Sequence, residues 1–394
     1  MAGKIKTFPA DFVVEEIPLY EPCGEGEHLY VTIRKTKMSH DECLRKIAKH
    51  FAVSIRDIGS AGRKDLQAVT TQTFSVYLRG KKPEIPQKIG NIDVLSNSYH
   101  SNKLRLGHLL GNRFSIRIRE VDEEILPQVQ DKIQTLEEEG MPNFFGRQRF
   151  GNAGNNHELG LWLIKEDWDS LVSSLLGGDE TYNEFAKVGE YKQALNAWPF
   201  GQPAERNVLE ALVAGKTMKQ ACKTISKSLK KLWVNALQSS LFNKLLTMRI
   251  EDGSWNTLLV GDLAYKHDGG GRTFEVTSEE IDIALDKRVE AMELSPSGPL
   301  WGTKMRLPTG DVLQKEIEVR ESIGLDDSHL VTMGKYAQGA RRALRVKVKD
   351  SKVTFANDEH GDFIELQFGL PAGSYATVMV DFCLGLSPRL KKIS

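Results

Sequence analysis

The sequence contains little cysteine and none of the common zinc-binding spacings. Its 394 residues include four cysteines, of which no two form a C-x-x-C pair, and nine histidines without an H-E-x-x-H motif. Few, scattered cysteines are typical of a reducing compartment, and structural zinc sites need paired ligands. We therefore expect reduced cysteines and no metal site.

Long apolar runs are also missing. The first residues, MAGKIKTFPADFVVEE, lack the apolar segment of a signal peptide, and no run approaches the ~20 residues that span a bilayer. There is no coiled-coil pattern and no long exposed apolar stripe. These absences favour a cytoplasmic, monomeric protein without a membrane partner.

The chain has no net charge, because 53 basic residues balance 53 acidic residues. The charges are nevertheless segregated. Residues 216–231 hold six lysines and no acid, and residues 340–349 hold three arginines and two lysines. Such tracts form either a basic surface that binds phosphates or ordinary solvated helix faces. The candidate phosphate contacts of the first tract are Lys223, Lys227, Lys230 and Lys231.

Cofactor motifs are absent as well. The sequence has no phosphate-binding G-x-x-x-x-G-K-[ST], no dinucleotide fingerprint, no G-x-S-x-G and no methyl-donor site. The segment HDGGGR lacks the lysine and hydroxyl of a phosphate loop, so we interpret it as a hairpin or loop tip. We therefore expect no cofactor.

The two ends of the chain are rich in strand patterns, whereas its middle is helical. Alternating apolar residues predict strands, and apolar residues that recur every four positions predict helices. A capping box of Ser39 and Glu42 marks one helix start. The early elements are predicted strands at 28–36, 73–78, 103–109 and 113–121 and predicted helices at 39–52 and 122–139.

Helical patterns dominate between residues 162 and 340, most clearly at 222–250. Sequence patterns typical of strands return at 345–350 and 362–382. This order predicts one sheet-based domain that carries an inserted helical domain, which is an α+β architecture.

Asp65 is the first candidate for chemistry. It follows Arg63 and Lys64 in GSAGRKDLQAVTTQ, on a loop between a predicted helix and a predicted strand. Adjacent cations favour the ionised form of a carboxylate, and loops on a rigid scaffold often carry reactive groups. The alternative is an ordinary surface turn.

Two further stretches combine aromatic and polar residues. MPNFFGRQRFG (141–151) places three phenylalanines among Asn143, Arg147, Gln148 and Arg149. Rings and guanidinium planes stack on unpaired bases, and amides read base edges; the alternative is a small aromatic cluster in the core. LPAGSYAT (370–377) forms a turn that presents Tyr375, which can stack on a base or simply pack.

Together these stretches resemble the TruD-type tRNA pseudouridine synthases. AGRKDLQAVTTQ is similar to the G-x-K-D-x-x-A-x-T-x-Q signature of that family, and PNFFGRQRFG is similar to its N-[YF]-F-G-x-Q-R-F-G element. Further similar stretches follow in the family order along nearly the whole chain: KTFPADFVVEE, GEGEHLYVTI, KLRLGHLLGNRFSIRIREV, LFNKLL, PSGPLWGT, ARRAL and LPAGSYAT.

The resemblance implies a role for each matching residue. Asp65 takes the position of the catalytic aspartate, and Lys6 matches a basic residue near the active site. Phe12, Asn143 and Tyr375 fall where the family contacts the substrate uridine, and Phe145 falls at an aromatic position that supports the pocket. Tyr375 replaces a common phenylalanine, and Phe144 replaces a common tyrosine, so both positions remain aromatic.

The resemblance also implies the fold and the reaction. It predicts a pseudouridine-synthase-type catalytic domain with a mixed, largely antiparallel sheet (1–165 and 347–394) and an inserted, mostly helical domain (166–346). The expected activity is isomerisation of uridine in tRNA, at position 13 of the D arm. Three alternatives stay open: a synthase acting on another RNA, a non-catalytic RNA-binding protein and a carboxylate-pair glycosidase.

Overall fold

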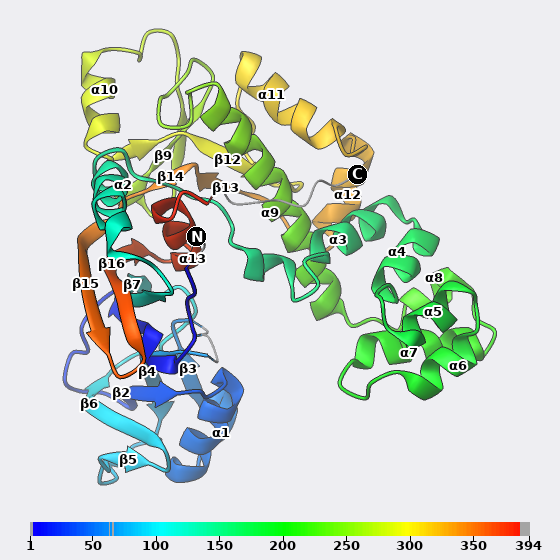
Figure 1. Cartoon of the computed structure of the whole chain (residues 1–394), viewed down its shortest axis with the longest axis horizontal. Helices are drawn as coiled ribbons and strands as arrows, with labels where there is room; N and C mark the ends of the chain where they lie inside the picture. Colours follow the sequence, from blue (N-terminus) through cyan, green and yellow to red (C-terminus); the bar gives the residue numbers. More distant parts are fainter. Residues whose placement is uncertain (1–2, 63, 65–66, 387–394) are drawn as a thin grey trace. The chain divides into compact units, whose positions relative to one another are not determined.

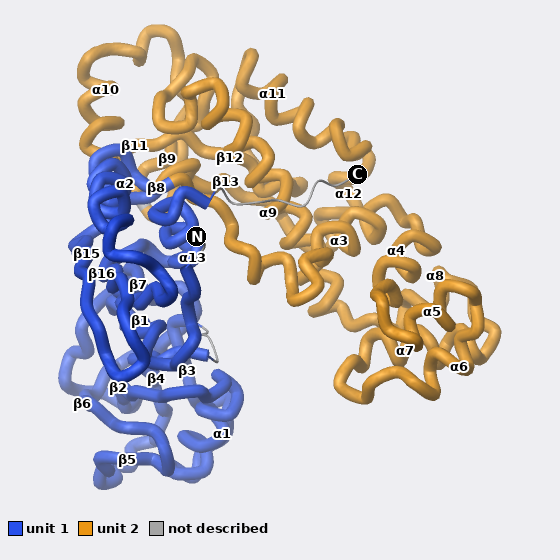
Figure 2. The backbone as a smooth tube through the Cα atoms, in the orientation of Figure 1, with its two compact units in different colours: residues 1–141, 346–387 blue, residues 142–345, 388–394 orange. Residues whose placement is uncertain are grey.

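The computed structural model describes residues 3–62, 64 and 67–386. These residues form two compact units, coloured separately in Figure 2: residues 3–141 and 346–386 form the first unit, and residues 142–345 form the second. The second unit is therefore an insertion in the chain of the first. Residues 142–165 belong to the second unit, although we expected the inserted domain to begin at residue 166. The assignment of catalytic and inserted domains remains a proposal.

A nine-stranded sheet dominates the described part of the first unit (Figure 1). Its order is β15-β16-β7-β1-β4-β2-β6-β5, with β3 also paired to β4. Among the described strand pairs of this sheet only β1 and β4 run parallel, so the sheet is mixed and largely antiparallel. The strands are β1 (Phe12–Pro18), β2 (His28–Thr36), β3 (Ile58–Ser60), β4 (Val69–Tyr77), β5 (Lys88–Ile89), β6 (Ile92–His100), β7 (Leu109–Arg119), β15 (Lys349–Asp358) and β16 (Gly361–Pro371).

The described part of the first unit also contains three α-helices: α1 (His40–Phe51), α2 (Leu126–Glu139) and α13 (Ala376–Cys383). Helix α1 begins where predicted, because the Ser39 side chain accepts a hydrogen bond from the Glu42 amide at 3.1 Å. Its residues Cys43, Ile47 and Phe51 join a core with alternate residues of β2. Alternation along a strand therefore leaves the other face of β2 free of α1.

Two predictions for this unit were wrong. Residues 103–108 are not a strand, and β7 runs continuously from Leu109 to Arg119 through residues 110–112, which separate the predicted strands 103–109 and 113–121. Residues 376–383 form α13, although their β-branched pattern predicted a strand. The strand at 28–36 matches β2, and the strand at 73–78 matches the second half of β4.

The second unit is mostly helical. Its helices are α3 (Asn156–Lys165), α4 (Trp168–Leu175), α5 (Thr181–Lys187), α6 (Tyr191–Ala197), α7 (Pro203–Val213), α8 (Met218–Cys222), α9 (Lys227–Glu251), α10 (Ile283–Glu290), α11 (Gly310–Glu321) and α12 (Asp327–Gly334). Its short strands are β9 (Leu263–Lys266), β10 (Thr273–Glu275), β11 (Leu294–Ser295), β12 (Ser297–Leu300) and β13 (Ala340–Ala343). The chain passes between the units within β8 (Met141–Pro142) and β14 (Arg345–Val346). The mixed sheet and this helical insertion confirm the predicted α+β class.

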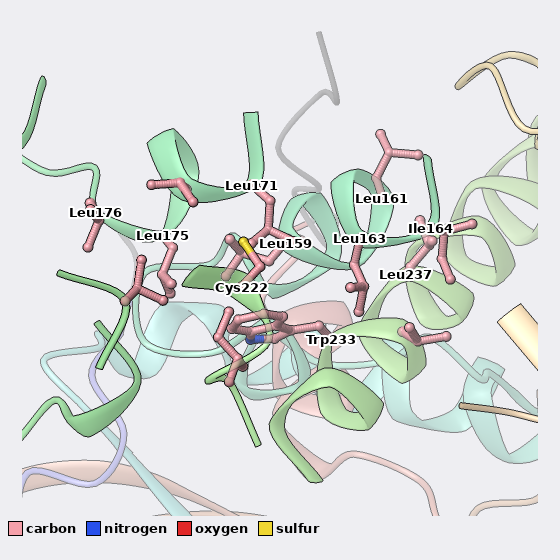
Figure 3. Close-up of a cluster of buried hydrophobic side chains, with 14 of the residues drawn as sticks. Leu159, Leu161, Leu163, Ile164, Leu171, Leu175, Leu176, Cys222, Trp233 and Leu237 are labelled. Atoms are coloured by element: carbon pink, nitrogen blue, oxygen red, sulfur yellow. The ribbon is translucent and has the colours of Figure 1, made fainter. Parts of the chain in front are cut away.

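The core of the second unit forms around α9, as its four-residue period predicted. Trp233 and Leu237 are buried among leucines of α3 and α4 (Figure 3). Helix α3 approaches α9 closely at Gly160, where an added Cβ would lie 2.4 Å from the Trp233 carbonyl oxygen. HDGGGR forms the predicted hairpin tip, because β9 and β10 pair antiparallel on either side of it. None of the described helices is both long and apolar enough to cross a membrane.

Candidate functional site

Asp65 and Arg63 lie outside the described residues, so the predicted catalytic role of Asp65 stays a proposal. The segment that contains them is bounded on both sides by described residues that are anchored in the sheet. Strand β3 leads into it and β4 follows it, and the Gln72 side chain donates a hydrogen bond to the Gly62 carbonyl at 2.7 Å. The structure therefore fixes both ends of the segment through the central strand β4.

Lys64 makes a buried ion pair with Glu16 of β1. Their Nζ and Oε1 atoms lie 2.9 Å apart, and the two side chains are only 8% and 5% exposed. The Lys64 ammonium also donates to Asn112 Oδ1 at 2.6 Å. Glu16 in turn accepts from the Gln72 side chain at 3.1 Å and from the Thr73 amide at 3.2 Å. We call these five residues the Glu16 cluster.

The Glu16 cluster was not predicted from the sequence. A buried pair costs desolvation and is tolerated only when further hydrogen bonds satisfy both groups, as they do here. The only signal was the pair of acids Glu15 and Glu16 in the otherwise apolar strand FVVEEIP. Because Glu16 neutralises Lys64, the charge of Lys64 is already balanced by a partner other than Asp65.

Lys6 and Phe12 meet in the first unit. The Lys6 ammonium lies 4.3 Å from the centroid of the Phe12 ring, which is a cation–π distance. Lys6 has a φ of 60°, an uncommon backbone conformation for a residue with a side chain. The Phe12 ring is only 3% exposed and contacts Phe114 edge to face. The Phe12 ring is therefore mostly covered in this structure, and its predicted contact with the substrate uridine stays a prediction.

A second buried charge cluster sits directly before Phe12. Arg119 makes hydrogen bonds to both oxygens of Asp11, at 2.6 to 2.9 Å, and to both oxygens of Asp358, at 2.8 and 2.9 Å. Asp11 also accepts from the Phe8 amide at 2.9 Å, which closes the turn ahead of Phe12. The guanidinium of Arg119 therefore ties the segment carrying Phe12 to β7 and β15.

Asp358 should make the stability of this segment depend on pH. Its hydrogen bonds to Arg119 hold the pKa of its carboxyl well below the ordinary value. A depressed native pKa stabilises the fold above the unfolded value of about 4, and this contribution is lost as the pH falls below it. Asp358→Asn should therefore lower the melting temperature most at pH 7. The difference in melting temperature between the wild type and the variant should become smaller below about pH 4. The exposed Asp362 of β16 provides the control, Asp362→Asn. An equal loss at all pH values would contradict the assignment.

Tyr375 occupies the turn that the sequence predicted. Gly373 has a φ of 85°, which favours glycine, and the Ser374 amide donates to the Pro371 carbonyl at 3.3 Å. Tyr375 is the N-cap residue of α13 and is half-buried. It is thus the one predicted aromatic contact of the first unit that keeps substantial exposure.

Asn143 and Phe145 belong to the second unit, and both are buried. The Asn143 side chain donates to the Ala343 carbonyl at 2.9 Å and accepts from Arg342 at 2.5 Å. The Arg342 guanidinium also lies 4.1 Å from the centroid of the Phe145 ring. Asn243 of α9 bonds both backbone groups of Phe145, at 2.8 and 3.0 Å. This element is therefore clamped to α9 and β13.

The three phenylalanines of that element lie in the core. Phe144, Phe145 and Phe150 are 4%, 8% and 7% exposed. The three rings therefore lie as the aromatic-cluster alternative describes, and the role of Phe145 in supporting the uridine pocket stays a prediction. Arg147 is exposed, whereas Arg149 is half-buried and donates to Ser239 at 3.0 Å.

The two basic tracts differ in exposure. Lys223, Lys227 and Lys231 are exposed around the start of α9, and partial burial lowers the pKa of the Lys230 ammonium. The second tract does not form the expected phosphate surface through its arginines: Arg341 binds the buried Glu316, Arg342 binds Asn143, and Arg345 is 3% exposed. Its sequence pattern could not reveal these partners.

The predicted site residues are thus divided between the units: Lys6, Phe12 and Tyr375 lie in the first, and Asn143 and Phe145 lie in the second. Their joint action is part of the proposal below.

Comparisons with known proteins agree with this architecture. A sequence model of the family tRNA pseudouridine synthase D (TruD) matches residues 1–381. The chain is 37% identical over 391 residues to the tRNA pseudouridine synthase D of Syntrophotalea carbinolica, covering 96% of this chain and 95% of the relative. It is 37% identical over 388 residues to the corresponding protein of Geobacter metallireducens, covering 96% and 94%. A crystal structure of the TruD protein of Methanosarcina mazei matches with a TM-score of 0.81 and 26% identity, over 98% of this chain and 94% of that one. The chain therefore belongs to the TruD family of tRNA pseudouridine synthases.

Proposed function

We propose that this protein isomerises uridine to pseudouridine in tRNA, at position 13 of the D arm. The observation that carries the proposal is the family match over residues 1–381. The extent of that match supports an enzyme rather than a binding module that shares only part of the chain. The position within the tRNA rests on the resemblance of the motifs alone.

The reaction needs no donor. The bond between C1′ and N1 breaks, the uracil turns over, and C5 bonds to C1′ as a proton leaves C5 and N1 gains one. The target must first leave its stack, because the enzyme cannot reach C1′ inside a helix. Asp65 would act on the ribose, either by attacking C1′ or by removing a proton from C2′ to form a glycal. Both routes need an ionised carboxylate.

Lys6 is the cation to which we assign the stabilisation of the ionised Asp65 carboxylate. Lys64 already shares its charge with Glu16, whereas Lys6 lies on the segment of the predicted site residue Phe12. A nearby ammonium favours the ionised form of a carboxylate. Lys6 would thus keep Asp65 charged.

The remaining residues would hold the flipped uridine. Tyr375 is half-buried and offers both a ring face and a hydroxyl. Asn143 accepts one bond from Arg342, but an amide oxygen has a second lone pair, which could accept the N3–H of uracil. Phe145 would support Asn143 from the core rather than contact the base.

The test is direct product detection. Purified protein is incubated with unmodified tRNA, and pseudouridine is detected by chemical labelling and mapped along the strand. Pseudouridine at position 13 supports the full proposal, and modification elsewhere corrects the target. Binding without product would favour a non-catalytic RNA-binding protein, and release of free uracil would favour a glycosidase.

The lysines at the start of α9 should contribute to tRNA affinity. Changing Lys223, Lys227 and Lys231 together to Glu should weaken tRNA binding about tenfold or more. The salt slope, which is the slope of the logarithm of the binding constant against the logarithm of the salt concentration, should fall in magnitude by roughly 2, because each lost phosphate contact removes about 0.7–0.9. Acids in the first turns favour a helix, so α9 should still form. The matched control reverses the exposed Lys287, Lys304 and Lys335. Equal affinities of both triple variants would remove the α9 lysines from the RNA surface.

A further inference from the structure

Two adjacent cavities lie in the first unit on the side of β2 that faces away from α1. The inner cavity has a volume of about 270 Å³ and is lined by Tyr30, Thr32 and Thr73 among others. The outer cavity has a volume of about 540 Å³ and is more open. Tyr20, Glu21 and His108 line both. None of these residues takes part in the reaction proposed above.

Aromatic rings form the wall that the cavities share. Tyr20 stacks on His100 with a centroid distance of 5.2 Å and meets His108 edge to face at 5.6 Å. Its hydroxyl lies 2.7 Å from His108 Nδ1 and 3.3 Å from the Tyr30 hydroxyl, which donates to the Asn102 carbonyl at 3.0 Å. Burial raises the pKa of Tyr30, so its phenol stays protonated. These bonds hold the rings in fixed orientations.

The loop that carries His108 is held by close packing. At Gly59 of β3 an added Cβ would lie 2.1 Å from the Leu104 carbonyl oxygen, so only glycine permits this approach. The Leu104 amide also donates to Ser75 at 2.9 Å. The loop that lines both cavities is therefore held in place by these contacts with β3 and β4.

Charge separates the two cavities. Lys103, Arg105 and His100 line the outer one, together with the exposed Glu21. The inner cavity has no lysine or arginine among its described lining residues. Its two carboxylates are Glu16, which is paired with Lys64, and the exposed Glu21, and its other polar groups include Thr32, Ser96 and Asn97. An anionic group would therefore favour the outer cavity, and a neutral ring with polar edges would favour the inner one.

The cavities adjoin the segment that leads to Asp65. Ala61 lines the inner cavity, and its carbonyl accepts from the Gly107 amide at 3.0 Å. Glu16 lines the same cavity and binds Lys64. A ligand here would therefore lie beside the anchored start of the predicted catalytic loop.

We propose that these cavities bind one unpaired nucleotide of the substrate RNA that flanks the target uridine. Its base enters the inner cavity against Tyr20, and its phosphate lies in the outer cavity near Lys103 and Arg105. Base stacking on aromatic side chains combined with nearby cations is the usual chemistry of single-stranded RNA binding. The inference rests on the proposed function, which it extends by naming a second RNA-binding subsite.

The test uses two variants of the full chain. Tyr20→Leu removes the aromatic ring. Arg105→Glu reverses the charge of an exposed side chain, so this substitution should not impair folding. Tyr20→Leu should raise KM for tRNA about tenfold with kcat nearly unchanged, since a stacked base contributes roughly 1–3 kcal/mol. Arg105→Glu should raise KM and lower the salt slope by about 0.7–0.9. Arg45→Glu, on the exposed side of α1, is the matched control.

A fluorescent base separates this proposal from the proposed function. The adenine analogue 2-aminopurine is placed on either side of the target uridine in a short single-stranded RNA, and its quenching on binding is measured. Quenching at one position that is lost in Tyr20→Leu supports the subsite, even if no pseudouridine forms. Unchanged quenching and unchanged KM in both variants would overturn it, while an inactive wild-type protein would overturn only the proposed function.

Discussion

Replacing Asp65 by asparagine is expected to reduce pseudouridine formation by roughly 10³-fold or more, as removal of a covalent catalyst or base does in other enzymes. Asparagine keeps the size of the side chain but cannot attack C1′ or accept the C2′ proton as a carboxylate does. Affinity for tRNA should stay close to that of the wild type, because phosphate contacts dominate the binding of nucleic acids. Single-turnover rates and a binding titration on the same preparation measure both quantities.

The control for this experiment is Asp57→Asn, another acid ahead of β4 that lies on the short helix Ile55–Asp57. It should retain full turnover. If Asp65→Asn formed pseudouridine as fast as the control, Asp65 would not be the catalytic carboxylate. The non-catalytic RNA-binding alternative would be favoured by a different result, namely a wild-type protein that binds tRNA but forms no pseudouridine.

Removing the charge of Glu16 should have the largest effect on stability. Glu16→Gln leaves the Lys64 ammonium buried without a counter-charge, and breaking such a pair costs about 3–5 kcal/mol of unfolding free energy. The start of the loop that carries Asp65 should shift with Lys64, so kcat should fall more than KM rises. Chemical denaturation and steady-state kinetics measure the two effects.

A double variant separates charge from structure. Glu16→Leu with Lys64→Met buries no charge and should recover most of the stability, because apolar replacements of buried ion pairs are often neutral or stabilising. Asp93→Asn at the exposed pair with Lys88 is the control and should cost at most about 1 kcal/mol. A loss in Glu16→Gln no larger than this control would contradict the importance of the Glu16 cluster.

Local sequence patterns were sufficient where a segment's own residues decide its structure. The alternation at 28–36 gave β2, and the Ser39 cap with a four-residue period gave α1. They failed where distant packing decides. Residues 103–108 look like a strand, but the contact of Leu104 with Gly59 holds them as a loop. Residues 376–383 likewise have the β-branched pattern of a strand, but they form α13 because the preceding turn places Tyr375 as the N-cap of a helix.

The site shows the same division. Motifs identified Lys6, Phe12, Asn143 and Tyr375 as candidates, because those residues stand in recognisable stretches. The Glu16 cluster and the pair of Asp11 with Arg119 were missed, since Arg119 lies 108 residues from Asp11 in the chain. Burial also could not be inferred for the phenylalanines of 144–150, whose polar neighbours suggested an exposed surface.

The position of β16 beside β7 has a consequence for synthesis on the ribosome. Ser115 and Glu365 are hydrogen-bonded across these strands although they are 250 residues apart. At ordinary translation rates, the partner of β7 emerges roughly 10–50 s after β7 itself. During that interval the nascent chain carries an unpaired strand edge, while the whole helical insertion leaves the ribosome and can fold first. We therefore expect the nascent first unit to depend on chaperones until residues 361–371 emerge.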